Sequence, residues 1–324
     1  MHLLFLLLSL LVVAVAGSVV LRTADRHTDW ARRRELQLGV LVGPVITIAA
    51  ATTAFVHFAT QVCFLGAPPW DALAAGGFSA VTAWLALAGL GFGVVRALFM
   101  QVTLARKGVT AEPWLQEIAG NLADRLGAPR PSVLVCHYQR PRALTYGFFR
   151  PKVLLSTWMM ENLDAHELEA VVAHEVGHVA RRDYLVGWVA TVLRDAFFYL
   201  PASRGAYRRL RRDNEPACDD LAVVLTRRPL ALASALAKVW QDAAEGPRLQ
   251  LAQALSGPAG SRLVESRLER LVAGPAPRAG SPGTGNLALR MITPALAGLA
   301  AQAGSVAFLL ISMDCALPRS GFFG

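Results

Sequence analysis

Long apolar runs alternate along this chain with amphipathic and turn-rich segments. A membrane-spanning helix needs about 20 consecutive apolar residues, and four runs meet that length. They cover about residues 3–21, 36–65, 78–100 and 291–313. A shorter apolar stretch, 184–200, carries Arg194 and Asp195 and ends at Pro201, which favours a buried or interfacial helix. The pattern predicts a polytopic α-helical membrane protein with about four spans.

The first run could also be a secretory signal peptide, because residues 14–16 (AVA) resemble a cleavage site. No Lys or Arg precedes it, whereas signal peptides begin with basic residues, so a retained anchor is favoured. Basic residues follow it instead, in the loop 22–35: Arg22, Arg26, Arg32, Arg33 and Arg34. The loop 66–77 has none. The positive-inside rule then predicts a multi-pass protein of the bacterial plasma membrane, with segment 101–290 cytoplasmic and both termini external.

Segment 101–290 has the mixed periodicity of an α+β domain. Helices are predicted at about 112–126, 215–225, 231–244 and 261–273, and strands at 131–138 and 152–156. Pro113 in the first turn and Gly127 after the last mark the bounds of the first of these helices. Residues 274–285 (GPAPRAGSPGTG) form a linker. We therefore expect three spans in 1–100, a peptidase-sized domain in 101–290, and a last span with a short tail in 291–324.

Composition agrees with a membrane protein, because 54% of residues are hydrophobic and the mean hydropathy is +0.41. The net charge of +9 suits an anionic inner leaflet of the lipid bilayer. No compact basic–aromatic motif accompanies that charge, so direct nucleic-acid binding is not expected. Cys136 and Cys218 should be cytoplasmic thiols. Cys63 and Cys315 lie at the external ends of their predicted spans, where they could form a disulfide.

Candidate chemistry lies in the HExxH motif His174-Glu175-Val176-Gly177-His178. On a helix, His174 and His178 lie one above the other and can bind one zinc ion, while Glu175 can take a proton from the attacking water. The alternative is a surface helix that happens to carry two histidines. Small and branched apolar neighbours indicate a buried helix, where unpaired histidines would be costly without a metal. Asp164 is predicted to cap this helix.

Zinc in a hydrolase usually takes three protein ligands, and the third should follow the motif. Glu215 and Asp219 have ExxxD spacing, so Glu215 could bind zinc while Asp219 holds a ligand histidine. The alternative ligands are Asp183, Asp213 and Asp220. The same stretch also fits an ordinary helix start, capped by Asn214 or Asp213, with Pro216 in the first turn.

The order of these features resembles the antirepressor membrane metallopeptidases, relatives of the bacterial beta-lactam sensor-transducers. The shared features are three leading spans, HExxH followed by RRD at 181–183, an apolar helix ending at Pro201, EPACD at 215–219, an arginine-containing helix at 266–271, and a final span. The resemblance implies a gluzincin-type domain with one Zn²⁺ bound by His174, His178 and Glu215, Glu175 as base and Asp219 beside a ligand. Asp183 matches the aspartate that follows the zinc-binding helix in this family. Its expected role is either to cap a helix or to take part in catalysis.

The antibiotic-sensing members carry an extracellular penicillin-binding domain after the last span. The resemblance therefore implies a short form that lacks this sensor. It also implies a protein substrate such as a cytoplasmic transcriptional repressor, cleaved in regulatory signalling.

Three other classes of membrane protein fit the sequence less well. The order of the predicted spans and the sequence Ala217-Cys218-Asp219 match the heat-shock and prenyl-protein membrane zinc peptidases less well. Intramembrane proteases place HExxH within a span, which the charged residues on both sides of the motif exclude. A non-catalytic sensor or scaffold would have no need to retain Glu175. We therefore expect a membrane zinc metalloendopeptidase that acts on the cytoplasmic side.

Overall fold

The computed structural model describes residues 2–60, 81–99 except 82, 83, 86 and 97, 108–245, and 259–274. The helices are α1 (His2–Ala24), α2 (Trp30–Thr60), α4 (Pro113–Arg125), α5 (Thr157–Asn162), α6 (Ala165–Ala180), α7 (Asp183–Ala196), α8 (Pro201–Thr226), α9 (Pro229–Glu245) and α11 (Ala259–Val272). The strands are β1 (Val109–Thr110), β2 (Ser132–Cys136), β3 (Ala143–Tyr146) and β4 (Lys152–Ser156).

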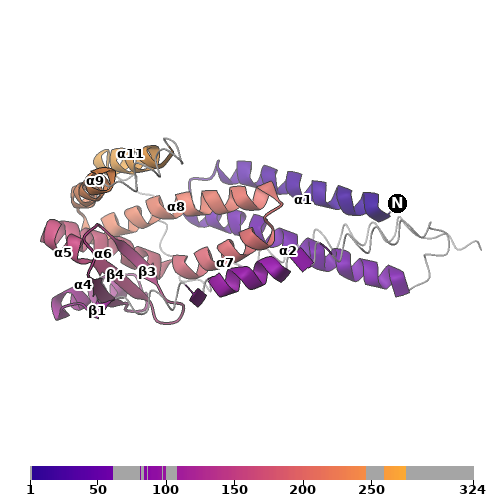
Figure 1. Ribbon diagram of the computed structural model, residues 1–324. Helices are drawn as coiled ribbons and strands as arrows, with labels where there is room; N and C mark the ends of the chain where they lie inside the picture. Colours follow the sequence, from indigo (N-terminus) through magenta and orange to yellow (C-terminus); the bar gives the residue numbers. More distant parts are fainter. Residues whose placement is uncertain are drawn as a thin grey trace, which may run out of the picture.

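Two large hydrophobic cores lie next to each other along α8. The first packs the sheet against α4, α5, α6 and α9, and the second packs α1, α2 and α7 against the first half of α8. Helix α8 belongs to both, because Leu210 lies in the second core and Ala222 in the first. In Figure 1 the sheet end and the helical end are joined by this long helix, and the N-terminus lies far from the sheet. Residues in the middle of α8 therefore lie where the two cores meet.

The sheet has the order β1-β2-β4-β3, with β2 and β4 parallel and the two outer pairs antiparallel. β4 is buried along most of its length, as its sequence KVLLS predicts. β3 pairs with β4 and is the outer strand on that side of the described sheet. At Gly147, after β3, φ is +102°, and a side chain there would clash with the carbonyl of Arg150. This turn needs glycine to bring the chain back into β4.

Helix α6 begins at a capping box. The Asp164 side chain accepts hydrogen bonds from the backbone N–H groups of His166 and Glu167, and the Glu167 side chain accepts one from the Asp164 N–H. Glu167 also accepts hydrogen bonds from Ser234 and Lys238 of α9, which ties the helix start to the core. The predicted cap at Asp164 is confirmed.

Several other predicted elements are confirmed. Helix α4 begins at Pro113, and Gly127 after it has a φ of +61°. Strands β2 and β4 and helices α7, α9 and α11 lie where the pattern predicts them. Cys136 and Cys218 are free thiols, as expected, while Cys63 and Cys315 lie outside the described residues.

Two predictions about local structure are wrong. The segment at 215–225 is not a separate helix capped by Asn214 or Asp213, because α8 runs unbroken from Pro201 to Thr226 with Pro216 inside it. The proline removes one backbone donor, but burial of α8 against α2 and α6 on both sides of it holds the helix together. The second error is β3, which lies between the two predicted strands, where no strand was predicted. The four residues of β3, between Pro141 and Gly147, carry too little pattern to predict a strand.

Helices α1 and α2 cover the first predicted span and most of the second, and helical residues between 81 and 99 lie within the third. The fourth, at 291–313, lies outside the described residues, as does nearly all of the linker 274–285. None of the helices that the structure describes is long and apolar enough to cross a membrane. That these segments span a bilayer stays a prediction.

Candidate metal centre

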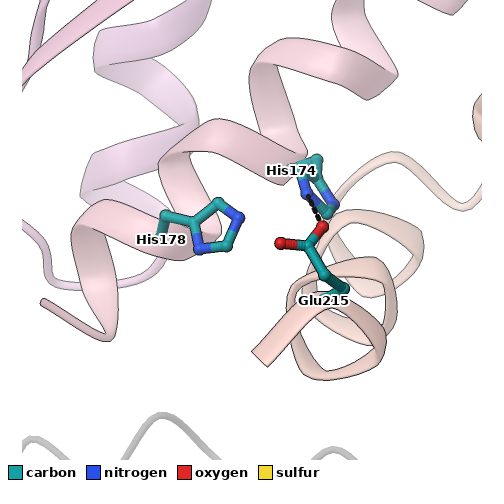
Figure 2. Close-up of side chains that lie close together, drawn as sticks. All are labelled: His174, His178 and Glu215. Carbon is teal, nitrogen blue, oxygen red and sulfur yellow. Dashed lines mark ion pairs between the residues drawn. The ribbon is translucent and has the colours of Figure 1, made fainter. Parts of the chain in front are cut away.

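Three side chains converge at the junction of the two cores. His174 and His178 project from neighbouring turns of α6, and Glu215 faces them from the middle of α8 (Figure 2). One potential ligand atom from each lies within 4.8 Å of the other two. The Nε2 atom of His174 is 3.6 Å from Oε2 of Glu215. Two imidazole nitrogens and a carboxylate oxygen at this spacing are a donor set that suits Zn²⁺.

A carboxylate lies behind each histidine. Nδ1 of His174 is 3.0 Å from Oδ1 of the fully buried Asp219, although the two groups are not aligned as a hydrogen bond. Nδ1 of His178 is 3.0 Å from Oδ2 of Asp183. Carboxylates in these positions favour the tautomer protonated at Nδ1, which leaves Nε2 of each ring free to bind a metal.

Arginine residues fix both carboxylates in turn. Arg267 of α11 donates to both oxygens of Asp219 over 2.8 Å, and a third nitrogen of the same guanidinium is 3.1 Å from Oε2 of Glu215. Such a planar fork holds a carboxylate in one orientation. The C-terminal helix of the described structure thus contacts both carboxylates that α8 presents at the centre.

Asp183 is held by two arginines. Arg181 donates to its Oδ2 over 3.0 Å, and Arg34 of α2 lies 3.2 Å from its Oδ1. Asp183 reaches this position because Arg182, between α6 and α7, adopts a left-handed backbone with φ of +52°. That conformation is unfavourable for a residue with a side chain. The turn folds the first residue of α7 back onto His178.

The charges of these groups shift their pKa values strongly in the metal-free protein. Burial acts to raise the pKa of Asp183, but the two arginines and His178 outweigh it and hold this pKa far below its usual range. Burial likewise opposes ionisation of Asp219, whose pKa His174 and Arg267 still lower strongly. Burial alone would lower the pKa of His174, yet Asp219 and Glu215 raise it to about 10. The pKa of Glu215 falls to about 2, mainly through His174, against the effect of burial.

A second group of potential ligands, His178, Asp183 and Cys218, also lies within 4.8 Å. The Cys218 thiol donates to Asp183 over 3.4 Å, and burial raises its pKa well above the ordinary value, so it stays protonated and is a poor metal ligand. Two arginines already neutralise Asp183. A cation would have to displace both arginines from Asp183. We therefore interpret His178, Asp183 and Cys218 as part of the surroundings of the first centre and not as a second metal site.

Glu175 lies beside the centre and faces the sheet. The hydroxyl of Thr145, on β3, donates to Oε2 of Glu175 over 2.7 Å. A cavity of about 380 Å³ opens onto the three converging side chains and Glu175. Its walls include β3 residues 143–145 on one side and Tyr184 and Trp188 of α7 on the other. A carboxylate, a donor set for a metal and an open cavity therefore meet in one place.

The alternative ligand candidates lie elsewhere. Asp213 accepts a hydrogen bond from Gln37 of α2, and Asp220 accepts one from Trp30. Asp183 approaches only the Nδ1 side of His178. Among the four acidic candidates, the structure brings Glu215 alone to the face that both histidines share.

The sequence did not predict three residues that contact Glu175 or the carboxylates of the metal centre. Thr145 lies in the unpredicted strand, and Arg34 was interpreted only as a marker of topology. Arg267 lies in a stretch that the family resemblance singled out, without a role for its guanidinium. Only Arg267 therefore carried a usable signal in the sequence.

Comparison with known proteins points to peptidases. Residues 82–231 match the family described as BlaR1 peptidase M56. The chain is 32% identical to protease HtpX homolog 1 of Streptomyces coelicolor over 181 residues, which are 44% of this chain and 60% of that protein. It is 30% identical to protease HtpX homolog 2 of Methanosarcina mazei over 161 residues, 39% of this chain and 55% of the relative.

A further relative, the protease HtpX homolog of Pyrobaculum calidifontis, is 37% identical over 98 residues, which are 30% of this chain and 28% of that protein. The chain therefore matches less than two thirds of the length of each of these relatives. Together the similarities support a metallopeptidase, and they do not distinguish the BlaR1 type from the HtpX type.

Proposed function

We propose that this chain is a membrane zinc endopeptidase that binds one Zn²⁺ through His174, His178 and Glu215. The observation that carries the proposal is the convergence of these three groups within 4.8 Å beside Glu175. Structural zinc sites usually have four protein ligands, whereas catalytic sites have three and keep one position open. The cavity beside the centre provides that access.

The chain's own residues suit peptide hydrolysis. Zinc, when bound, would supply Lewis acidity that polarises the scissile carbonyl and lowers the pKa of the attacking water. Glu175 takes the proton from that water and later delivers it to the leaving amine. Thr145 orients the Glu175 carboxylate, and Asp219 and Asp183 keep the two histidines in their binding tautomer.

The edge of β3 that does not pair with β4, at residues 143–145, is the proposed docking site for the substrate. Residues 143–145 line the cavity, and the strand pairs on its other side with β4. An extended segment of a protein substrate can add to such an edge through backbone hydrogen bonds. Thr145 lies on this strand and also contacts Glu175, so the docked segment would pass directly beside the base.

Regulatory cleavage, such as that of a cytoplasmic repressor, is the physiological role that the antirepressor resemblance favours. The relatives named HtpX proteases support the alternative, a heat-shock type of membrane peptidase in quality control. The further proposals are a cytoplasmic peptidase domain at 101–290, spans in 1–100 and 291–324, and a plasma-membrane location. A non-catalytic scaffold remains the contrasting class.

Metal removal tests this function. The full chain in detergent is incubated with solubilised bacterial membrane and cytosolic proteins, and new N-termini are identified by mass spectrometry. We expect cleavage products with the zinc-loaded protein, none after treatment with a chelator, and their return when zinc is added back. Cleavage that persists without metal would contradict the proposal, and a folded chain that binds no zinc would favour the scaffold.

Zinc binding is expected to release protons. The pKa of His174 in the metal-free protein is about 10, because Asp219 and Glu215 outweigh burial, so this ring is protonated at pH 7. A zinc ion must displace that proton, and apparent zinc affinity should therefore rise by roughly tenfold per pH unit between about pH 7 and 9. Calorimetric titration in buffers of different ionisation enthalpy measures the number released. A value near zero at pH 7 would contradict the raised pKa of His174.

A further inference from the structure

Arg34 connects the N-terminal helices directly to the proposed zinc site. It lies near the start of α2, and its guanidinium is 3.2 Å from Oδ1 of Asp183 and donates to the backbone carbonyl of Arg181 over 2.8 Å. These contacts join residues separated by almost 150 positions in the chain. The side chains of Arg34 and Asp183 are only 12% and 6% exposed, so water competes little with the pair.

The two oxygens of Asp183 have different partners. Oδ2 faces Nδ1 of His178 and also accepts from Arg181 and Cys218, whereas Oδ1 faces Arg34. Rotation of this carboxylate would move Oδ2 away from His178, and Arg34 opposes that rotation by holding the other oxygen. The carbonyl of Arg181, which Arg34 also binds, lies at the C-terminal cap of α6. Arg34 thus holds both the carboxylate and the end of the helix that carries His178.

We propose that Arg34 is a positioning residue for the metal ligand His178, so that α2 completes a metal centre whose ligands come from α6 and α8. This inference rests on the proposed zinc site. Arg34 of α2 contacts the carboxylate of Asp183, and Asp183 contacts the imidazole of His178, which is a proposed zinc ligand. A displacement of α2 relative to α6 would therefore act on the orientation of His178 through Asp183.

Arg33 offers a matched control on the same helix. Its side chain is 13% exposed, and its guanidinium is 3.2 Å from Asp213 and 3.5 Å from Asp25. Asp213 and Asp25 are not among the proposed zinc ligands. In the described structure, neither of them contacts His174 or His178. Arg33→Gln should therefore cost packing and charge pairing comparable to Arg34→Gln, without disturbing His178.

The test compares the full chain carrying Arg34→Gln or Arg33→Gln with the wild type in detergent. Zinc affinity is measured by competition with a chromophoric chelator, and the geometry of the centre by the optical spectrum of the cobalt-substituted protein. We expect Arg34→Gln to weaken zinc binding by roughly tenfold, the lower end of the effect of outer partners of metal ligands, and to shift the cobalt spectrum. Arg33→Gln should leave both unchanged, whatever it does to the thermal unfolding midpoint.

Equal zinc affinity and equal cobalt spectra for the two variants would overturn the inference and make Arg34 merely structural. If Arg34→Gln does not fold, Arg34→Lys decides, because one ammonium group cannot reach Asp183 and the Arg181 carbonyl in the same geometry. Measurable weakening of zinc affinity supports the inference, and unchanged affinity overturns it. A wild type that binds no zinc would instead refute the proposed function.

Discussion

Replacing Glu175 by glutamine is expected to lower the turnover number for peptide cleavage by roughly 10²- to 10⁴-fold, the usual contribution of a general base. Glutamine has nearly the same size and can still accept the hydrogen bond from Thr145, but it cannot take a proton from water. Zinc content should stay at about one per chain, because Glu175 is not among the three converging ligand groups. Initial rates on a substrate identified by N-terminal profiling, with metal analysis of the same samples, measure both quantities.

Glu169→Gln is the matched control on the same helix. Glu169 forms a partly exposed ion pair with Arg228 at 2.9 Å, away from the cavity. Such surface pairs contribute about 0–1 kcal/mol, so fold and activity should both be retained. Full activity of the Glu175→Gln protein would show that another group is the base. Loss of zinc together with activity would assign Glu175 a part in metal binding instead.

Glu215→Ala is expected to remove most of the zinc. Structural zinc sites with four ligands bind with about 10–16 kcal/mol, so one ligand corresponds to roughly 3 kcal/mol and more than a hundredfold in affinity. The fold should survive, because the Glu215 side chain is 38% exposed and Arg267 keeps its two bonds to Asp219. Metal analysis after dialysis, with thermal unfolding of the same protein, checks both expectations.

Arg211→Ala provides the comparison for this variant. Arg211 lies one turn before Glu215 on α8, lines the same cavity and is exposed, but has no atom that binds a cation. Its zinc content should equal that of the wild type. Equal zinc in the Glu215→Ala protein would keep the metal centre and redirect the search for the third ligand to the other acidic candidates, Asp183, Asp213 and Asp220.

Elements with strong local signals were predictable from the sequence. The capping box at Asp164 specifies where α6 begins, and the proline at the start of α4 and the glycine after it specify that helix. Both signals work through backbone hydrogen bonds and dihedral angles within a few residues. Pro216 shows the limit of such reasoning, because its local preference for a helix start is overridden by the burial of α8 in two cores.

The HExxH spacing by itself determined that His174, Glu175 and His178 share one stretch of helix, since four residues make about one turn. Only the tertiary structure decided which acidic residue faces them. Glu215, Asp213 and Asp220 lie on one helix within a few positions, and the direction each side chain takes depends on how α8 packs between α2 and α6. The roles of Thr145 and Arg34 were likewise decided by packing, because their contacts join segments 30 to 149 residues apart, and no local sequence pattern encodes such distances.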